Sequence, residues 1–180
     1  AAAVRPGVSA DALDALAQSL GKQRRPPWAT DLDAIGRAVM SEIANSRETA
    51  ESARFLDAVA GALPDDAVVF ADMAICGYWL SAYLPVTRPR SLHYPMGWGT
   101  LGFAFPAAIG AAAHFRGTRP VLSFSGDGGM LIAIGELATL AQYNLAMTAV
   151  VVDDDGYGML RYGRHGRTDD SDLPSPDFAA

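Results

Sequence analysis

The stretch that decides the fold is Val-Leu-Ser-Phe-Ser-Gly-Asp-Gly-Gly at residues 121–129. Its first five residues favour a β-strand, and the sequence after it favours a helix. Glycines at such a turn let backbone N–H groups approach a phosphate, and the helix dipole favours negative charge at the same point. The stretch therefore predicts a strand, a turn that can bind an anion, and a helix.

Further strands and helices alternate on both sides of this stretch. Residues 67–71 and 148–152 favour strands, because they are apolar and rich in β-branched side chains. Helical patterns lie between and before the strands, at residues 52–63, 106–115 and 136–143. Strands of this kind, separated by helices, predict an α/β fold with a parallel sheet and helices on both faces.

Acidic residues or glycines end all three predicted strands. Asp72 follows the first strand, Gly126-Asp127 the second and Asp153-Asp154 the third. Open parallel sheets bind ligands beyond the carboxyl ends of their strands. We therefore expect the chemistry of the chain at these positions.

The two ends of the chain have a different sequence pattern from this region. Residues 1–51 carry two helical patterns, Ala10–Leu20 and Leu32–Ile43, separated by a basic, proline-broken segment, and are interpreted as an interdomain linker with peripheral helices. Residues 52–180 form the predicted domain, which is expected to be incomplete at its C-terminal end. Within them, residues 161–172 are charged and lack periodicity, which favours a mobile loop.

The composition excludes several classes of partner. The 180 residues carry a formal net charge of -6, which argues against general binding to nucleic acid or anionic membranes. The single cysteine excludes an internal disulfide and a multi-cysteine zinc site, and is typical of a reducing cytoplasm. No apolar stretch is long enough for a membrane span, so the sequence predicts a cytoplasmic protein.

Carboxylates at neighbouring strand ends suggest a metal site. Asp127 ends one strand and Asp153-Asp-Asp155 ends the next, so the two groups are expected to be neighbours. Mg²⁺ prefers a compact set of oxygen ligands, usually one or two carboxylates together with phosphate and water. The alternative is that Asp127 caps a helix and the acidic run is a solvated loop. Spacing alone leaves both interpretations open.

Several segments together resemble one enzyme superfamily. Gly126-Asp127-Gly128, followed by the acidic end of an apolar strand, resembles the thiamine diphosphate signature of Gly-Asp-Gly, a spacer and Asn-Asn. The residues at 97–110, 136–139, 142–144 and 156–161 are similar to those of the acetolactate synthase group. The similarity runs from about Ser52 to Ala180, and it implies that the chain binds thiamine diphosphate and Mg²⁺.

The resemblance also assigns roles to individual residues. It makes Asp127 and Asp154 side-chain ligands of Mg²⁺, and Gly156 a ligand through its carbonyl oxygen. Gly128 and Gly129 would cradle the diphosphate, and Gly126 is expected to bind the cofactor as well.

A second group of residues would contact the rings of the cofactor. Leu101 lies where the family has a bulky apolar residue that forces the cofactor into its bent form, and Gly99 and Leu101 would bond the pyrimidine through their backbones. The alternative for Leu101 is core packing. Residues 72–76 are predicted to form a loop, and this loop lies where acetolactate synthases often have a Gly-Gln-His segment. Cys76 in this loop would replace a polar contact to the diphosphate, or else be a small buried thiol. His93, His114 and His165 match no catalytic position of the family.

The acidic pair departs from the family pattern, which has Asn at both positions. One extra unit charge at about 4 Å and an effective dielectric near 20 changes the interaction energy by about 4 kcal/mol, attracting Mg²⁺ and repelling diphosphate. We expect Asp154 to raise metal affinity and to make cofactor binding more dependent on the metal.

The family resemblance implies the reaction as well. Acetolactate synthases decarboxylate pyruvate and condense the product to a 2-acetohydroxy acid in branched-chain amino acid biosynthesis. The proton relay begins at a glutamate of a separate pyrimidine-binding domain, usually on the partner subunit of a homodimer or tetramer. No segment here resembles that domain, so we expect a fragment that catalyses nothing alone and releases no carbon dioxide from pyruvate. Two alternatives stay open: a benzoylformate-type 2-oxo acid decarboxylase and a noncatalytic cofactor-fold module.

Overall fold

A computed structural model describes residues 10–20, 32–163 and 176–178. The internal contacts of the chain divide it into two units, residues 1–43 and residues 44–180. In the first unit lie α1 (Ala10–Leu20) and most of α2 (Leu32–Asn45), which agree with the two helices predicted there. None of the described side chains of α2 is fully buried.

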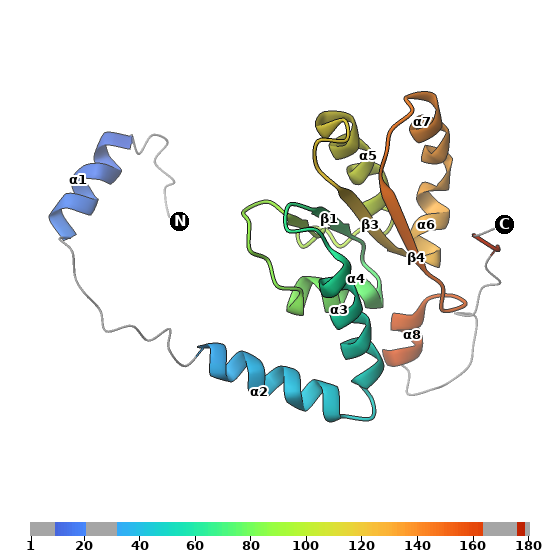
Figure 1. Ribbon diagram of the computed structural model, residues 1–180, viewed down its shortest axis with the longest axis horizontal. Coiled ribbons are helices and arrows are strands. Elements are labelled where there is room, and N and C mark those ends of the chain that lie inside the picture. Colours follow the sequence, from blue (N-terminus) through green and yellow to red (C-terminus); the bar gives the residue numbers. More distant parts are fainter. Residues whose placement is uncertain (1–9, 21–31, 164–175, 179–180) are drawn as a thin grey trace, which may run out of the picture. The chain divides into compact units, whose positions relative to one another are not determined.

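The second unit is built on a parallel sheet of four strands (Figure 1). The strands are β1 (Val68–Ala71), β2 (Leu92–His93), β3 (Val121–Gly126) and β4 (Thr148–Val152). Their order across the sheet is β2-β1-β3-β4, and every neighbouring pair is parallel. The predicted α/β fold with a parallel sheet is confirmed, and β4 has the predicted bounds.

Helices cover both faces of this sheet (Figure 1). They are α3 (Ala50–Ala62), α4 (Ile75–Tyr83), α5 (Ala104–Phe115), α6 (Asp127–Ala133), a 3-10 turn (Ile134–Glu136), α7 (Leu137–Gln142) and α8 (Gly158–Gly163). On one face, Val68 and Phe70 of β1 pack against the alanines of α5. On the other face, Phe55 of α3 meets Phe124 of β3 edge to face, with ring centroids 6.3 Å apart. The two central strands therefore contribute side chains to an apolar layer on each side of the sheet.

The register of the strands brings their carboxyl ends to one edge. Ala71 lies opposite Phe124, and Gly126 lies opposite Val152. The residues that follow are Asp72, Asp127 and Asp153. The sequence-based expectation that these strand ends are neighbours is therefore confirmed.

The structure corrects several predicted boundaries. The segment 72–76, expected to be a loop, is a loop only to Ala74, because α4 begins at Ile75. Helix α5 begins at Ala104, so Pro106 is its third residue, still within the first turn where a missing N–H is harmless. Helix α8 takes in Arg161–Gly163, which were expected to belong to a mobile loop; the rest of that predicted loop, residues 164–172, lies outside the described residues. In the part of the chain that the structure describes, no helix is long and apolar enough to cross a membrane.

Candidate functional site

A cavity of about 370 Å³ opens at the carboxyl ends of β1, β3 and β4. All nine residues predicted to contact a cofactor line it: Cys76, Gly99, Leu101, Gly126, Asp127, Gly128, Gly129, Asp154 and Gly156. They come from four separate segments of the chain. The structure therefore brings the whole predicted set into one place, and the roles assigned to these residues remain predictions.

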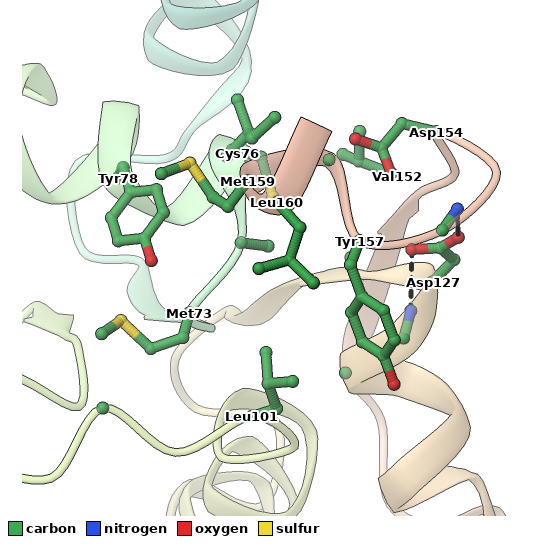
Figure 2. Close-up of a pocket in the computed structure, with 18 residues that line it drawn as sticks. Met73, Cys76, Tyr78, Leu101, Asp127, Val152, Asp154, Tyr157, Met159 and Leu160 are labelled. Atoms are coloured by element: carbon green, nitrogen blue, oxygen red, sulfur yellow. Dashed lines mark hydrogen bonds between the residues drawn. The ribbon is translucent and has the colours of Figure 1, made fainter. Parts of the chain in front are cut away.

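Asp127 lies at the polar end of this cavity and is held by backbone groups. It begins α6 directly after β3, and only 3% of its surface is exposed. Its Oδ1 accepts a hydrogen bond from the N–H of Gly128 and its Oδ2 one from the N–H of Gly156, both at 2.7 Å (Figure 2). A carboxylate has about four acceptor positions, so it can accept two such bonds and also bind a cation. The arrangement fixes the carboxylate and ties β3 to the turn after β4.

Asp154 comes to the same end of the cavity from the turn after β4. Asp155 and Gly156 both have positive φ, 59° and 135°, which folds this turn back toward Asp127. The carboxylate of Asp154 lies against Gly158, where an added Cβ would overlap Oδ2 of Asp154. Asp153, in contrast, is exposed and accepts a hydrogen bond from the N–H of Asp155 at 3.1 Å. Of the three aspartates in this run, only Asp154 lines the cavity.

Glycines in the turn after β3 allow neighbouring groups to approach its backbone closely. A Cβ on Gly128 would lie 2.9 Å from the ring of Tyr157, and one on Gly129 would lie 2.6 Å from Oδ2 of Asp72. The backbone here is therefore in contact with neighbouring groups on sides where any other residue would carry a side chain. Tyr157 packs over Gly128, so its ring forms one wall of the cavity beside Asp127 (Figure 2).

The opposite end of the cavity is apolar. Figure 2 shows the side chains of Met73, Tyr78 and Leu101 on the side away from Asp127 and Asp154. Leu101 lies in a loop whose flanking glycines, Gly99 and Gly102, have φ of 69° and 76°. Leu101 is partly exposed and lines the cavity, whereas core packing would bury it.

Cys76 is a buried thiol at the start of α4. It is 5% exposed and forms no disulfide. Burial raises the pKa of Cys76 from 9.0 to about 12, and the charges of Asp72 and Asp154 add to this effect, while the N–H of Gly77 opposes it. The interpretation of Cys76 as a small buried thiol agrees with this environment. The thiol also lines the cavity, so its position is compatible with contact to a ligand as well.

We expect Cys76 to resist alkylation in the folded protein. The thiolate is the nucleophile, and a shift of pKa from 9.0 to about 12 lowers its fraction near neutral pH roughly a thousandfold. Iodoacetamide at pH 8 should label the folded chain far more slowly than the chain unfolded in urea. Rapid labelling of the folded chain at pH 8 would contradict this environment.

The same rise in the pKa of Cys76 makes the stability of the folded chain decrease at alkaline pH. Because the folded pKa is raised above the unfolded value, the contribution of the thiol to stability is complete below pH 9.0 and is lost as the pH rises toward about 12. Urea unfolding at pH 7 and pH 10 measures this loss, and Cys76→Ala should reduce the difference between the two pH values.

His93 and His114 lie away from the cavity. His93 is in β2, where its ring stacks on Phe70 with centroids 4.7 Å apart, and His114 packs edge to face on Phe115 near the end of α5. Neither lines the cavity, and His165 lies outside the described residues.

Several lining residues were not singled out from the sequence. They are Met73, Tyr78, Val152, Tyr157, Met159 and Leu160. Three of them, Tyr78, Met159 and Leu160, lie in the first turns of α4 and α8, short helices that periodicity does not identify. Proximity to a strand end is the feature of the sequence that could have identified two of these residues, since Met73 and Val152 lie at the carboxyl ends of β1 and β4.

The atoms that could bind a metal at the polar end of the cavity are suited to a hard cation. They comprise the carboxylates of Asp127 and Asp154 and the backbone of Gly156, all with oxygen atoms. No cluster of three or more His, Cys, Asp or Glu side chains that could hold a metal occurs among the residues that the structure describes. A set of two carboxylates completed by a carbonyl, phosphate and water is the type that Mg²⁺ uses.

Comparisons with known proteins agree with this geometry. Residues 72–180 match the family model of the thiamine pyrophosphate enzyme C-terminal TPP binding domain. The chain is 31% identical over 156 residues to the acetolactate synthase isozyme 1 large subunit of Escherichia coli (strain K12), covering 85% of this chain and 28% of that protein. It is 35% identical over 100 residues to the sulfoacetaldehyde acetyltransferase of Castellaniella defragrans, covering 54% of this chain and 16% of that protein.

A solved structure to which the chain is similar also belongs to a thiamine diphosphate-dependent enzyme. The thiamine diphosphate-dependent 4-hydroxybenzoylformate decarboxylase of Rhodococcus jostii RHA1 superposes with a TM-score of 0.60 at 28% identity, over 69% of this chain and 24% of that chain. The chain thus spans less than a third of the length of each of these relatives. With the family model matching more than half of its residues, the chain belongs to the thiamine pyrophosphate enzyme family, in which it corresponds to the C-terminal TPP-binding domain.

Proposed function

We propose that the cavity holds Mg²⁺ and the diphosphate of thiamine diphosphate, as part of an enzyme that decarboxylates a 2-oxo acid. The observation that carries this proposal is the pairing of Asp127 and Asp154 across the ends of β3 and β4, beside the glycine turn at Gly128 and Gly129. The family match supports the cofactor, and the oxygen donors support the metal.

The charge of the cavity supports the need for a metal. None of the 18 described lining residues is Lys, Arg or His, whereas two are aspartates. A diphosphate placed beside two carboxylates is repelled unless a cation lies between them. A divalent cation held by Asp127 and Asp154 would remove this repulsion. We therefore infer that the diphosphate binds only together with Mg²⁺.

The residues of the chain then have separate tasks. Asp127 and Asp154 hold the metal, with the carbonyl oxygen of Gly156 as a further ligand, and the N–H groups of Gly128 and Gly156 keep Asp127 in place. Leu101 and Gly99 support and orient the rings at the apolar end of the cavity. The bound cofactor supplies the electron sink that lets a 2-oxo acid lose carbon dioxide. The apolar wall excludes water from that end.

A second domain completes the site in this proposal. We infer that it is a pyrimidine-binding domain with the relay glutamate, from the same or a partner subunit. Met96 and Trp98, in the segment that leads to Gly99, are 79% and 93% exposed. Large exposed apolar side chains beside a ligand site are typical of an interaction surface, and this supports a homodimer or tetramer in which the segment is covered.

The substrate favoured by the resemblance is pyruvate, as in acetolactate synthases. A second candidate is a larger 2-oxo acid of the benzoylformate type. It is favoured by the apolar positions Ile75 and Cys76, which replace the polar segment found in acetolactate synthases, and by the likeness to the 4-hydroxybenzoylformate decarboxylase. The sulfur and aromatic side chains of Met73 and Tyr78 enlarge the same apolar wall.

A titration followed by NMR tests the proposed cofactor site, since it detects even weak binding. Addition of thiamine diphosphate with Mg²⁺ should shift the amide signals of Gly128, Gly129 and Gly156, and thiamine diphosphate with EDTA should not. Thiamine with Mg²⁺ is the control without a diphosphate, and it should shift these three signals no more than Mg²⁺ alone does. Absence of any shift at millimolar cofactor, or shifts confined to other segments, would refute the proposed site.

Replacing Asp154 by Asn tests the effect of the extra charge. We expect Mg²⁺ to bind the variant at least about tenfold more weakly, because a charge at about 4 Å contributes up to about 4 kcal/mol at an effective dielectric near 20. At saturating Mg²⁺ the affinity for thiamine diphosphate should fall much less. Calorimetry at several Mg²⁺ concentrations measures both, and an unchanged dependence on Mg²⁺ would show that Asp154 is not a ligand.

A further inference from the structure

Asp72 is a buried carboxylate at the carboxyl end of β1 that lies next to the cavity and does not line it. Only 1% of its surface is exposed. Its Oδ1 accepts hydrogen bonds from the N–H groups of Met73 at 2.9 Å and Phe103 at 3.3 Å, and its Oδ2 accepts one from the N–H of Gly102 at 2.9 Å. Two of these donors lie some thirty positions away in the sequence. The side chain therefore joins β1 to the loop that carries Leu101.

The same carboxylate touches the turn that carries Gly128 and Gly129. A Cβ on Gly129 would lie 2.6 Å from Oδ2 of Asp72 and 3.6 Å from the nitrogen of Gly102. A Cβ on Gly102 would in turn lie 3.4 Å from the carbonyl oxygen of Gly129. The two loops on either side of the cavity thus meet at the carboxylate of Asp72, and the side chain of Ile132 in α6 also packs against Gly102, 2.9 Å from a Cβ placed there.

Asp72 also supplies the start of α5 with hydrogen-bond acceptors and a negative charge, which the first turn of this helix lacks. Phe103, the residue before this 12-residue helix, makes no capping hydrogen bond with its side chain, and the first turn contains no acidic residue. The N–H groups at a helix start need acceptors, and negative charge is favourable there. Asp72 provides both from a distant strand. A shift of its carboxylate therefore moves the start of α5 together with Gly102 and Leu101.

We propose that Asp72 is a positioning residue that sets the separation between the Leu101 loop and the Gly128–Gly129 turn, and so matches the cavity to the length of the whole cofactor. This inference rests on the proposed function for the identity of the ligand. The contacts of Asp72 exist without that ligand. If Asp72 only stabilised the fold, its replacement would weaken the binding of every ligand of the cavity equally. If Asp72 sets the distance between the two loops, its replacement weakens the binding of a ligand that contacts both loops more than the binding of a ligand that contacts one.

The first test measures amide hydrogen exchange in the ligand-free chain. In Asp72→Asn the amide group of Asn has one oxygen in place of two, so an N–H group of Asn must face the N–H of Gly102 if the contacts to Met73 and Phe103 are kept. We expect the amide of Gly102 to exchange about tenfold faster or more, with the amides of β3 unchanged. The exposed Asp57→Asn on α3 is the matched control. Unchanged exchange at Gly102, or an equal increase throughout the sheet, would overturn the proposal.

The second test compares two ligands of the cavity. Thiamine diphosphate with Mg²⁺ reaches both loops, and pyrophosphate with Mg²⁺ reaches only the glycine turn. Asp72→Asn should weaken binding of the former about tenfold or more and change binding of the latter less than about twofold, a tenfold loss being about 1.4 kcal/mol. Equal weakening of both ligands means a merely structural role and overturns the proposal.

A third variant keeps the inference testable if Asp72→Asn does not fold. In Gly129→Ala the new methyl group would lie 2.6 Å from Oδ2 of Asp72, the atom that accepts the hydrogen bond from Gly102, so the exchange at Gly102 should rise in the same selective way. If neither ligand binds the wild-type chain, the proposed cofactor site fails while the exchange measurements still decide whether Asp72 holds the two loops together.

Discussion

Replacing Asp127 by Asn is expected to reduce Mg²⁺-dependent binding of thiamine diphosphate at least about a hundredfold. The variant has nearly the shape of the original side chain and removes one negative charge beside the metal, where a unit charge at about 4 Å contributes about 4 kcal/mol at an effective dielectric near 20. Asn also keeps only one oxygen for the two N–H groups of Gly128 and Gly156. One of these donors then faces an N–H group, so the turn after β4 loses its fixed distance from β3. Calorimetric titration of the cofactor at a fixed Mg²⁺ concentration below saturation measures the loss.

Asp153→Asn is the matched control for this prediction. It makes the same change of charge in the turn after β4, at a side chain that is exposed and does not line the cavity. Exposed charges are screened by water and salt, so its effect on affinity should stay below about threefold. Equal losses in both variants would mean that general electrostatics, and not ligation by Asp127, governs binding. Circular dichroism of both variants checks that the sheet is intact.

The sequence allowed much of the fold to be predicted because the sheet is of a simple kind. The segment Thr148–Val152 is rich in β-branched residues and pairs along its whole length with β3, so local preference and tertiary structure agree, and the predicted strand has the observed bounds. The strand ends also fixed the position of the cavity, since parallel neighbours end at the same edge. For this reason the strand ends placed Asp127 beside the acidic run at residues 153–155, and the family resemblance then selected Asp154 within that run.

Short elements could not be predicted for a physical reason. Strand β2 has two residues, Leu92 and His93, and forms only because β1 offers an open edge and Phe70 a ring on which His93 stacks. Such an element exists through tertiary contacts and leaves no periodicity in the sequence. The same holds for α4, whose first residues, Ile75 and Cys76, were interpreted as part of a loop. The contacts of Asp72 with the loop before α5 join segments some thirty residues apart, and no local pattern reports them.

Replacing Gly77 by Ala is expected to destabilise the chain by about 2 kcal/mol, although the same change usually stabilises a helix. Gly77 is buried in the first turns of α4, where an added Cβ would overlap the carbonyl oxygen of Asp72 and lie 3.0 Å from its carbonyl carbon. These atoms are backbone, and that oxygen already accepts a hydrogen bond from the N–H of Ala74 at 2.9 Å. The clash cannot be relieved by a side-chain rotation, so β1 or α4 must shift, and overpacking of this kind costs about 1–3 kcal/mol. Urea unfolding followed by circular dichroism measures the change.

Gly110→Ala is the matched control, because the same substitution meets no neighbour there. Gly110 lies in the interior of α5, is exposed, and has no atom within 4 Å of an added Cβ. Ala should stabilise this helix by about 0.8–1.0 kcal/mol, so the two substitutions should change the free energy of unfolding in opposite directions. A neutral Gly77→Ala would mean that the turn at Asp72 is loose, and a loose turn would not hold the Leu101 loop at a fixed distance from Gly129. The sign of this one substitution therefore tests the packing on which both the cavity and the positioning role of Asp72 depend.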